Sequence, residues 1–252
     1  MPVSHMRLAA FGDLHGNLPA TIAVLEDIAR AQPDFTVCLG DLVGYGADPS
    51  AVIARVRGAG VPVVMGNYDD GVGFDRDDCG CAYRDEMEFQ RGQASLRWTR
   101  DTVDHEAKAW LRTLPFDWRI ERCGHRVRAV HGSPRRINEY LFEDRDPASL
   151  ARLAATADCD ILLFGHTHQP WSRRVGDVLL VNAGSVGKPK DGDPRACWAE
   201  ITLAADSPPE VVFHRVDYDT RGAASAIRAA GLPDQFAIDV LTGGSRRPST
   251  PT

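Results

Sequence analysis

The chain has 252 residues, of which 43% are apolar and 25% are charged, and its formal net charge is −6 at pH 7. This composition is ordinary for a globular protein and argues against a disordered chain. The negative charge argues against binding along a nucleic-acid backbone, which needs a basic face. No apolar stretch approaches the roughly 20 residues that span a bilayer, and the N-terminal segment does not resemble a signal peptide. We therefore expect a cytoplasmic protein without membrane association.

The length is enough to bury the core of one domain, with room for an insertion. We expect a single domain over residues 1–242, because no internal repeat or linker divides the chain. The last residues, 243–252, are rich in Gly, Ser, Thr and Pro. Such a composition predicts a flexible tail.

Strand-like and helix-like segments alternate at the start of the chain. The apolar patterns predict strands over 7–11, 35–40 and 61–66 and helices over 18–31 and 49–57. Strands that alternate with helices favour right-handed βαβ units. We therefore expect a largely parallel sheet that helices cover on both faces.

The alternation stops at residue 68. The region 68–118 contains a loop rich in Gly and Asp and two helix-like segments, so we interpret it as a helical insertion or lid. The later segments predict a hairpin over 118–132, a helix over 147–157, strands over 160–166, 172–184, 197–204 and 211–218, and a helix over 219–231. Short connections between the last strands suit antiparallel pairing, so a second sheet or half-sheet is expected.

Five segments place polar side chains directly after β-like runs. The segments GDLHGN, LGDLVGYG, MGNYDD, AVHGSP and LFGHTHQP contribute Asp13, His15, Asp41, Asn67, His131, His166 and His168. Ligand sites in open α/β sheets lie at the carboxyl ends of the strands, so we expect these side chains to converge. Oxygen and imidazole ligands together suit divalent manganese, iron, zinc or nickel. Seven ligands exceed what one zinc-like ion uses, which favours two ions with a shared carboxylate.

The ordered motifs resemble those of the calcineurin-like metallophosphoesterases. The sequence contains DLH, GDLVG, GNYD, HG and GHTH in the order of that family, across residues 13–168. The stretches VGKPKDGDPRA and VDYD resemble the bacterial branch that contains small phosphodiesterases. The resemblance implies a four-layer α/β/β/α sandwich, here with a helical insertion beside the active site, that hydrolyses small phosphoesters.

The resemblance also implies roles for the individual residues. One ion would be held by Asp13, His15, Asp41 and His168, and Asp41 would bridge to a second ion held by Asn67, His131 and His166. A hydroxide between the two ions would attack phosphorus in line with the leaving group. The expected catalytic residues are Asp41, Asn67 and Tyr68.

Tyr68 departs from the pattern of the family, which commonly has His directly after the GN pair. A phenol with a pKa near 10 is a poor acid at neutral pH beside an imidazole. Poor leaving groups should therefore react slowly. We predict higher activity on phosphodiesters or activated anhydrides, including nucleotide-type substrates, than on simple alkyl monoesters.

Three further residues are candidates for substrate binding. Arg135 and Arg136 follow the HGSP segment, where their guanidinium groups could bind phosphate, although a solvated pair is an equal alternative. Asn17 could orient a ligand or the substrate, or it could cap the helix that follows it.

The sequence leaves three other functions open. Within enzymes, the alternatives are a dinucleoside polyphosphate hydrolase and a serine/threonine protein phosphatase, although a lid over the metals would exclude large protein substrates. In another class, the same fold could act as a non-catalytic scaffold that binds partners. A scaffold of that kind would have lost metal ligands, and all seven are present. The oligomeric state is not predicted.

Overall fold

The computed structural model describes residues 5–244. The strands within this range are β1 (His5–Phe11), β2 (Phe35–Cys38), β3 (Asp117–Arg122), β4 (His125–Val130), β5 (Ile161–Phe164), β6 (Trp171–Val175), β7 (Val178–Asn182), β8 (Ala196–Ala204) and β9 (Ser207–Val216). They form one sheet with the order β2-β1-β8-β9 and another with the order β3-β4-β5-β7-β6. The helices are α1 (Leu18–Ala31), α2 (Pro49–Ala59), α3 (Asn67–Gly73), α4 (Glu86–Thr102), α5 (His105–Leu111), α6 (Pro147–Ala155), α7 (Thr220–Ala229) and α8 (Asp234–Thr242).

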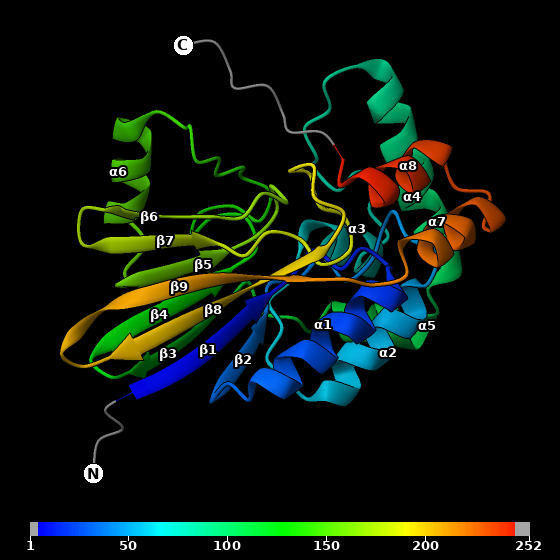
Figure 1. Cartoon of the computed structure of the whole chain (residues 1–252). Helices are drawn as coiled ribbons and strands as arrows, with labels where there is room; N and C mark the ends of the chain where they lie inside the picture. Colours follow the sequence, from blue (N-terminus) through cyan, green and yellow to red (C-terminus); the bar gives the residue numbers. More distant parts are fainter. Residues whose placement is uncertain (1–4, 245–252) are drawn as a thin grey trace.

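The apolar interior between the sheets is built by alternate residues of their strands. Leu8 and Ala10 of β1 pack there with Ala129 of β4 and Leu163 of β5. Because side chains alternate along a strand, Phe11 of β1 faces the other way and packs with α1 and α2. Helix α6 covers the outer face of the second sheet, and Figure 1 shows α6 and the α1–α2 pair on opposite sides of the stacked sheets. The predicted four-layer α/β/β/α sandwich is therefore confirmed.

Both sheets are mixed, so the expectation of a largely parallel sheet is wrong. Strand β1 pairs with β2 in parallel, and β5 pairs in parallel with β4 and β7. The β3–β4, β6–β7 and β8–β9 pairs are antiparallel because short turns join these consecutive strands. Strand β8 also pairs antiparallel with β1, from the start of the chain. The parallel pairs matter for the site, since they place the carboxyl ends of β1 and β2, and of β4 and β5, next to each other.

The third predicted strand, 61–66, forms only an isolated bridge between Val63 and Cys38 of β2. Pro62 has no N–H to donate, and two backbone hydrogen bonds, both with Cys38, hold the segment against β2. The segment still ends directly before α3, so Asn67 lies at the end of an extended run as predicted.

The later part of the chain follows the predictions with two differences. The hairpin over 118–132 and the helices over 147–157 and 219–231 are confirmed as β3–β4, α6 and α7. The run 172–184 is two antiparallel strands, β6 and β7, because a turn with left-handed backbone at Gly176 reverses the chain. Helix α8, which the sequence analysis does not predict, packs on α7.

The region 68–118 contains the two predicted helices, α4 and α5, and most of a third one, α3. Tyr68 and Val72 of α3 are buried, and α3 contacts both α4 and α5. The first turns of this region thus belong to the core, and a lid role for the rest stays a prediction. The tail predicted over 243–252 lies outside the described residues from residue 245 onward. No helix between residues 5 and 244 has both the length and the apolar character of a membrane span.

Candidate active site

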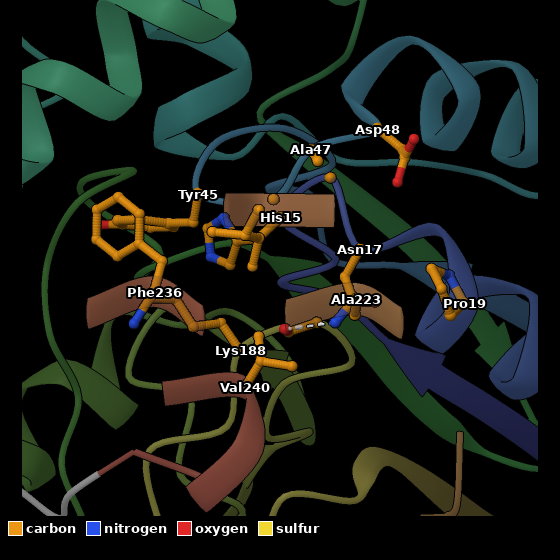
Figure 2. Close-up of a pocket in the computed structure, with 14 residues that line it drawn as sticks. His15, Asn17, Pro19, Tyr45, Ala47, Asp48, Lys188, Ala223, Phe236 and Val240 are labelled. Atoms are coloured by element: carbon orange, nitrogen blue, oxygen red, sulfur yellow. Dashed lines mark hydrogen bonds between the residues drawn. The ribbon is translucent and has the colours of Figure 1, made fainter. Parts of the chain in front are cut away.

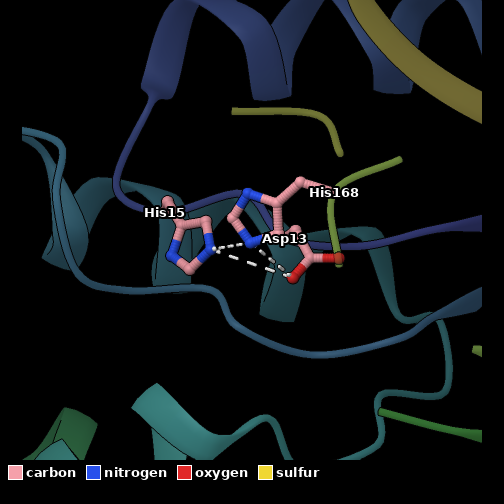
Figure 3. A group of neighbouring side chains, drawn as sticks. All are labelled: Asp13, His15 and His168. Atoms are coloured by element: carbon pink, nitrogen blue, oxygen red, sulfur yellow. Dashed lines mark hydrogen bonds and ion pairs between the residues drawn. The ribbon is translucent and has the colours of Figure 1, made fainter. Parts of the chain in front are cut away.

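One group of candidate ligands combines residues that follow β1 and β5. Asp13 and His15 come after β1, His168 comes after β5, and all three are buried. Asp13 Oδ1 lies 3.3 Å from His168 Nε2 and 3.8 Å from His15 Nε2. The two imidazole Nε2 atoms are 3.1 Å apart (Figure 3). These three side chains therefore present one oxygen and two nitrogens to a common point.

A second group comes from the ends of β2, β4 and β5 and from the start of α3. It consists of Asp41, His131, His166 and Asn67. His131 Nε2 lies 3.4 Å from Asp41 Oδ2, 3.2 Å from His166 Nδ1 and 3.0 Å from Asn67 Oδ1. The structure thus brings all seven predicted ligands into two adjoining groups.

Asp41 faces both groups. Its Oδ2 atom lies 3.7 Å from His15 Nε2 in the first group and 3.4 Å from His131 Nε2 in the second. Its Oδ1 atom accepts a hydrogen bond from the backbone N–H of Tyr68 at 2.8 Å. That bond fixes the orientation of the carboxylate, so one Asp41 oxygen faces both groups.

The hydrogen bonds of the first group leave two imidazole lone pairs facing each other. His15 Nδ1 lies 3.0 Å from Val43 O, and His168 Nδ1 lies 2.6 Å from Lys188 O. A carbonyl oxygen only accepts, so each Nδ1 carries the hydrogen and each neutral ring has a lone pair on Nε2. Those Nε2 atoms are 3.1 Å apart and cannot bond to each other in this state. A cation between them satisfies both, so the residues fit a divalent ion.

The second group has the same arrangement. His131 Nδ1 lies 2.8 Å from Leu39 O, which leaves the Nε2 of the neutral ring as an acceptor. The amide nitrogen of Asn67 donates to Cys79 O at 3.1 Å and to Cys81 Sγ at 3.3 Å, so its oxygen is the atom that faces His131. Two acceptors 3.0 Å apart need a proton or a cation between them. This group therefore also fits a divalent ion.

The four histidines of the site differ in pKa. Burial, and then the nearby His168, lowers the pKa of His15 to about 3, and burial also lowers the pKa of His168 and of His166. Burial alone would lower the pKa of His131 too, but Asp41 and Asp13 raise it to about 10. Three imidazoles are therefore neutral and have a free lone pair for an ion, whereas His131 is protonated on both ring nitrogens in the ion-free protein.

The backbone at the site is held in a conformation that side chains rarely adopt. Five candidate ligands have φ between 47° and 66°, namely Asp13, His15, Asp41, His166 and His168. Residues with a Cβ pay about 1 kcal/mol or more for this left-handed region and concentrate at functional sites. Glycines make the close approach possible, since a Cβ on Gly66 would lie 2.1 Å from Asp41 Oδ1. The strained backbone conformation of these five residues thus directs their side chains toward the site.

A cavity of about 270 Å³ opens beside both groups. Tyr45, on its wall, lies 4.8 Å from the His15 ring, and Tyr140 lies 3.9 Å from the His166 ring. Further walls come from the 81–84 segment, α4 and α8. Thr167, which separates the two histidines in the GHTH sequence, also lines the cavity. The cavity therefore lies one layer of side chains away from His15 and His166.

Comparison with known proteins gives the same assignment as the geometry. A family model described as the calcineurin-like phosphoesterase superfamily domain matches residues 6–204. The chain belongs to this superfamily. It is therefore a phosphoesterase, a hydrolase that acts on ester bonds.

Individual relatives cover most of the phosphoesterase. It is 32% identical to the uncharacterized protein MJ0912 of Methanocaldococcus jannaschii, over 94% of this chain and 98% of that one. It is 27% identical to the phosphodiesterase YfcE of Escherichia coli K12, over 75% of this chain and 84% of that one. A crystal structure of a metallophosphoesterase from Sphaerobacter thermophilus superposes with a TM-score of 0.74 at 30% identity, and covers 95% of this chain and 99% of that one.

Asp69 is a site residue of the phosphoesterase that the sequence analysis does not single out. Its carboxylate accepts hydrogen bonds from the backbone N–H groups of Asp41 at 2.8 Å, Leu42 at 2.9 Å and Gly66 at 2.9 Å. Burial, and then the Asp41 carboxylate, raises the pKa of Asp69 to about 7. Asp69 therefore joins the loops that carry Asp41 and Asn67. A carboxylate two residues after Asn67, in GNYDD, is the sequence signal that could have identified it.

The predicted substrate-binding residues lie away from the cavity lining. Asn17 accepts from Ala20 N at 3.2 Å as the cap of α1 and donates to Gly187 O at 2.9 Å, so its amide is used within the protein. It lines a smaller hollow of about 10 Å³, which holds no more than a water molecule, and Figure 2 shows Asn17 among the residues that line it. Arg135 and Arg136 are exposed, and Arg135 pairs with Glu139. The side chains of Asn17 and Arg135 thus have partners within the protein, and a role of the three residues in substrate binding stays a prediction.

Tyr68 is buried beside the first ligand group and does not line the cavity. Its exposed fraction is 1%, and its ring lies 5.5 Å from that of His15 and 4.8 Å from that of Tyr45. Its hydroxyl has no hydrogen-bond partner among the described residues, and burial raises its pKa further above 10. The structure thus gives the phenol a packing position against His15, and a direct role in catalysis stays a prediction.

Ion binding to the ion-free phosphoesterase should release protons. His131 has a pKa of about 10, so in the neutral range it holds a proton that a divalent ion has to displace. Burial also raises the pKa of Asp13. The affinity for the ion should therefore rise with pH through the neutral range. Calorimetric titration with Mn²⁺ in two buffers of different ionisation enthalpy measures the release. Equal binding enthalpies in both buffers would contradict the expectation.

Proposed function

We propose that this phosphoesterase hydrolyses small phosphodiesters, including nucleotide-type substrates, at a pair of divalent ions. The observation that carries the proposal is the position of Asp41, whose Oδ2 atom lies 3.7 Å from His15 Nε2 and 3.4 Å from His131 Nε2. A single carboxylate between two ligand groups is the arrangement that two-metal phosphoesterases use. YfcE, the relative from Escherichia coli, carries the name phosphodiesterase.

The protein residues divide the work as follows. Asp13, His15 and His168 would hold one ion, Asn67, His131 and His166 the other, and Asp41 both. The ions, when bound, supply an activated water and neutralise charge on the phosphoryl oxygens. The carbonyl partners of the imidazole Nδ1 atoms keep the rings oriented toward the ions. Manganese is our first choice of metal, with iron, zinc and nickel as alternatives.

The cavity supports a small substrate. Its volume of about 270 Å³ is near the lower limit of typical small-molecule pockets. Aromatic side chains line it, namely Tyr45, Tyr83, Tyr140, Phe142 and Phe236, and such rings suit a nucleobase or another planar group. The walls from 81–84 and α4 would obstruct a folded protein substrate. We therefore place a diesterase ahead of a protein phosphatase, and a cytoplasmic location remains our expectation.

The proposal is tested with bis-p-nitrophenyl phosphate as a model diester. Protein loaded with Mn²⁺ should release p-nitrophenol, and a chelator should abolish turnover until excess Mn²⁺ restores it. An alkyl monoester assayed in parallel should react more slowly. Protein that contains its metal and turns over no phosphoester would instead support the scaffold function.

A substitution at Tyr68 tests whether this residue sets the preference for diesters. If the phenol acts on the leaving group, Tyr68→His should raise monoester hydrolysis relative to diester hydrolysis, since an imidazole is the better acid near neutral pH. The ratio of the two kcat/KM values is the measurement, and the melting temperature controls for packing against His15. An unchanged ratio would leave Tyr68 with packing alone.

A further inference from the structure

The charged side chains that line the cavity do not all neutralise one another. The lining contains four basic and two acidic side chains, namely Arg84, Arg91, Lys188, Lys190, Glu88 and Asp239. Both acidic residues have basic partners, because Arg84 pairs with Glu88 and Lys188 pairs with Asp239. The lining therefore has an excess of positive charge in a protein whose net charge is −6.

Lys188 is fully used by its surroundings. Besides its ion pair with Asp239 of α8, its Nζ atom lies 5.0 Å from the ring centre of Tyr45 and 5.6 Å from that of Phe236. Figure 2 shows this lysine beside both rings. It is buried, with an exposed fraction of 6%. Lys188 thus joins α8 to the loop that follows β7, and its charge is not free for a ligand.

Lys190 differs from its neighbour two residues earlier. Its ammonium group has no hydrogen-bond or carboxylate partner between residues 5 and 244, although the side chain is half-buried. Arg91 also lacks a carboxylate partner in that range, but its guanidinium lies on Met87 of the same helix, α4. Removing a cation from water without a counter-charge is unfavourable. An anion that enters the cavity would supply that charge.

The backbone of Lys190 is tied to the ligand loop. Its N–H donates to His168 O at 3.2 Å, and its carbonyl accepts from Gln169 Nε2 at 3.0 Å. In the same loop, Lys188 O accepts from His168 Nδ1 at 2.6 Å. These bonds hold the loop against the first ligand group. The backbone of Lys190 is therefore fixed beside the site, and its ammonium group extends into the cavity.

We propose that Lys190 binds the non-bridging phosphoryl oxygens of the substrate. This inference rests on the proposed function, and it assigns to the site a protein cation in addition to the two ions. An ammonium there strengthens binding of a phosphodiester monoanion, and it stabilises the charge that the equatorial oxygens carry during displacement. Inorganic phosphate, which has the same oxygens, should bind to the same group.

The test uses Mn²⁺-loaded wild type, Lys190→Met and Lys190→Arg, with Lys108→Met as a control. Lys108 lies on α5, outside the cavity lining, and pairs with Asp75, so its loss should leave kcat/KM unchanged. Lys190→Met should lower kcat/KM on bis-p-nitrophenyl phosphate by about 10- to 100-fold, the usual effect of losing one charged hydrogen bond. It should weaken inorganic phosphate binding, measured by calorimetry, to a similar extent. Lys190→Arg should recover most of both.

The control measurements separate substrate binding from other roles. Ion content and melting temperature should stay at the wild-type values in Lys190→Met. Wild-type affinity for phosphate together with wild-type kcat/KM in this variant would overturn the proposal, and so would loss of bound ions. If the wild type itself turns over no diester, the proposed function fails, whereas the phosphate affinities of wild type and Lys190→Met still decide the role of Lys190.

Discussion

Asp41→Asn should lower kcat on bis-p-nitrophenyl phosphate by about 10³-fold, which corresponds to roughly 4 kcal/mol of transition-state stabilisation. The asparagine has nearly the same shape, and its oxygen can still accept from Tyr68 N. What it loses is the negative charge between the two ligand groups, at 3.7 Å from His15 Nε2 and 3.4 Å from His131 Nε2. Steady-state kinetics at saturating Mn²⁺ is the measurement.

Asp70→Asn is the matched control for this change. Asp70 lies on α3, and its carboxylate pairs with the exposed Arg76 at 2.5 Å. Such surface pairs contribute about 0–1 kcal/mol, so kcat should stay near the wild-type value. Asp41→Asn protein with wild-type kcat, or with a loss no larger than that of the control, would show that no shared carboxylate is needed.

Asp69→Asn should lower the free energy of unfolding by about 3 kcal/mol and weaken ion binding by about 10- to 100-fold. The carboxylate accepts three backbone N–H groups, two on Oδ2 and one on Oδ1. An amide keeps only one acceptor oxygen and turns an N–H₂ group toward a donor, so at least one buried N–H loses its partner. The loop that carries Asp41 should then become less well fixed.

Urea denaturation of the ion-free protein measures the first effect, and Mn²⁺ titration measures the second. Asp77→Asn provides the comparison, since the Asp77 side chain is fully exposed and surface substitutions usually change stability by about 0.5 kcal/mol or less. A midpoint for Asp69→Asn equal to that of Asp77→Asn would mean that the three hydrogen bonds do not hold the loops in place.

The candidate ligands could be predicted from sequence because their positions follow from local rules. A short apolar run ends, a polar residue follows, and parallel strands bring such ends to one edge. This rule predicts that His131 and the GHTH histidines converge with the other candidates, and the structure brings them together even though the sheets are mixed. The rule also holds for Asn67, although residues 61–66 do not form a regular strand. Pro62 weakens the pairing but leaves the chain extended up to Asn67.

The cavity could not be predicted, because its walls come from distant parts of the chain. Lys190, Tyr140, Arg91 and Phe236 lie in four different segments, and their meeting depends on tertiary packing. Helix α8, which supplies Phe236, has only nine residues and is not among the helices that the sequence predicts. Arg135 looked suited to phosphate because of its place after HGSP, but its partner Glu139 is set by the fold of the following loop. The residues of loops that line the cavity could therefore be identified only from the structure.

The central claim is that the active site holds two ions bridged by Asp41. It is tested most directly by measuring how many bound ions per chain are needed for activity. Ion-free protein is titrated with Mn²⁺, and bound ions per chain and hydrolysis of bis-p-nitrophenyl phosphate are measured at each point. A two-ion centre bridged by Asp41 predicts that turnover rises with occupancy of the second ion and reaches its maximum at two ions per chain, with the magnetic coupling of a manganese pair. Full activity at one bound ion, or with none, would contradict it.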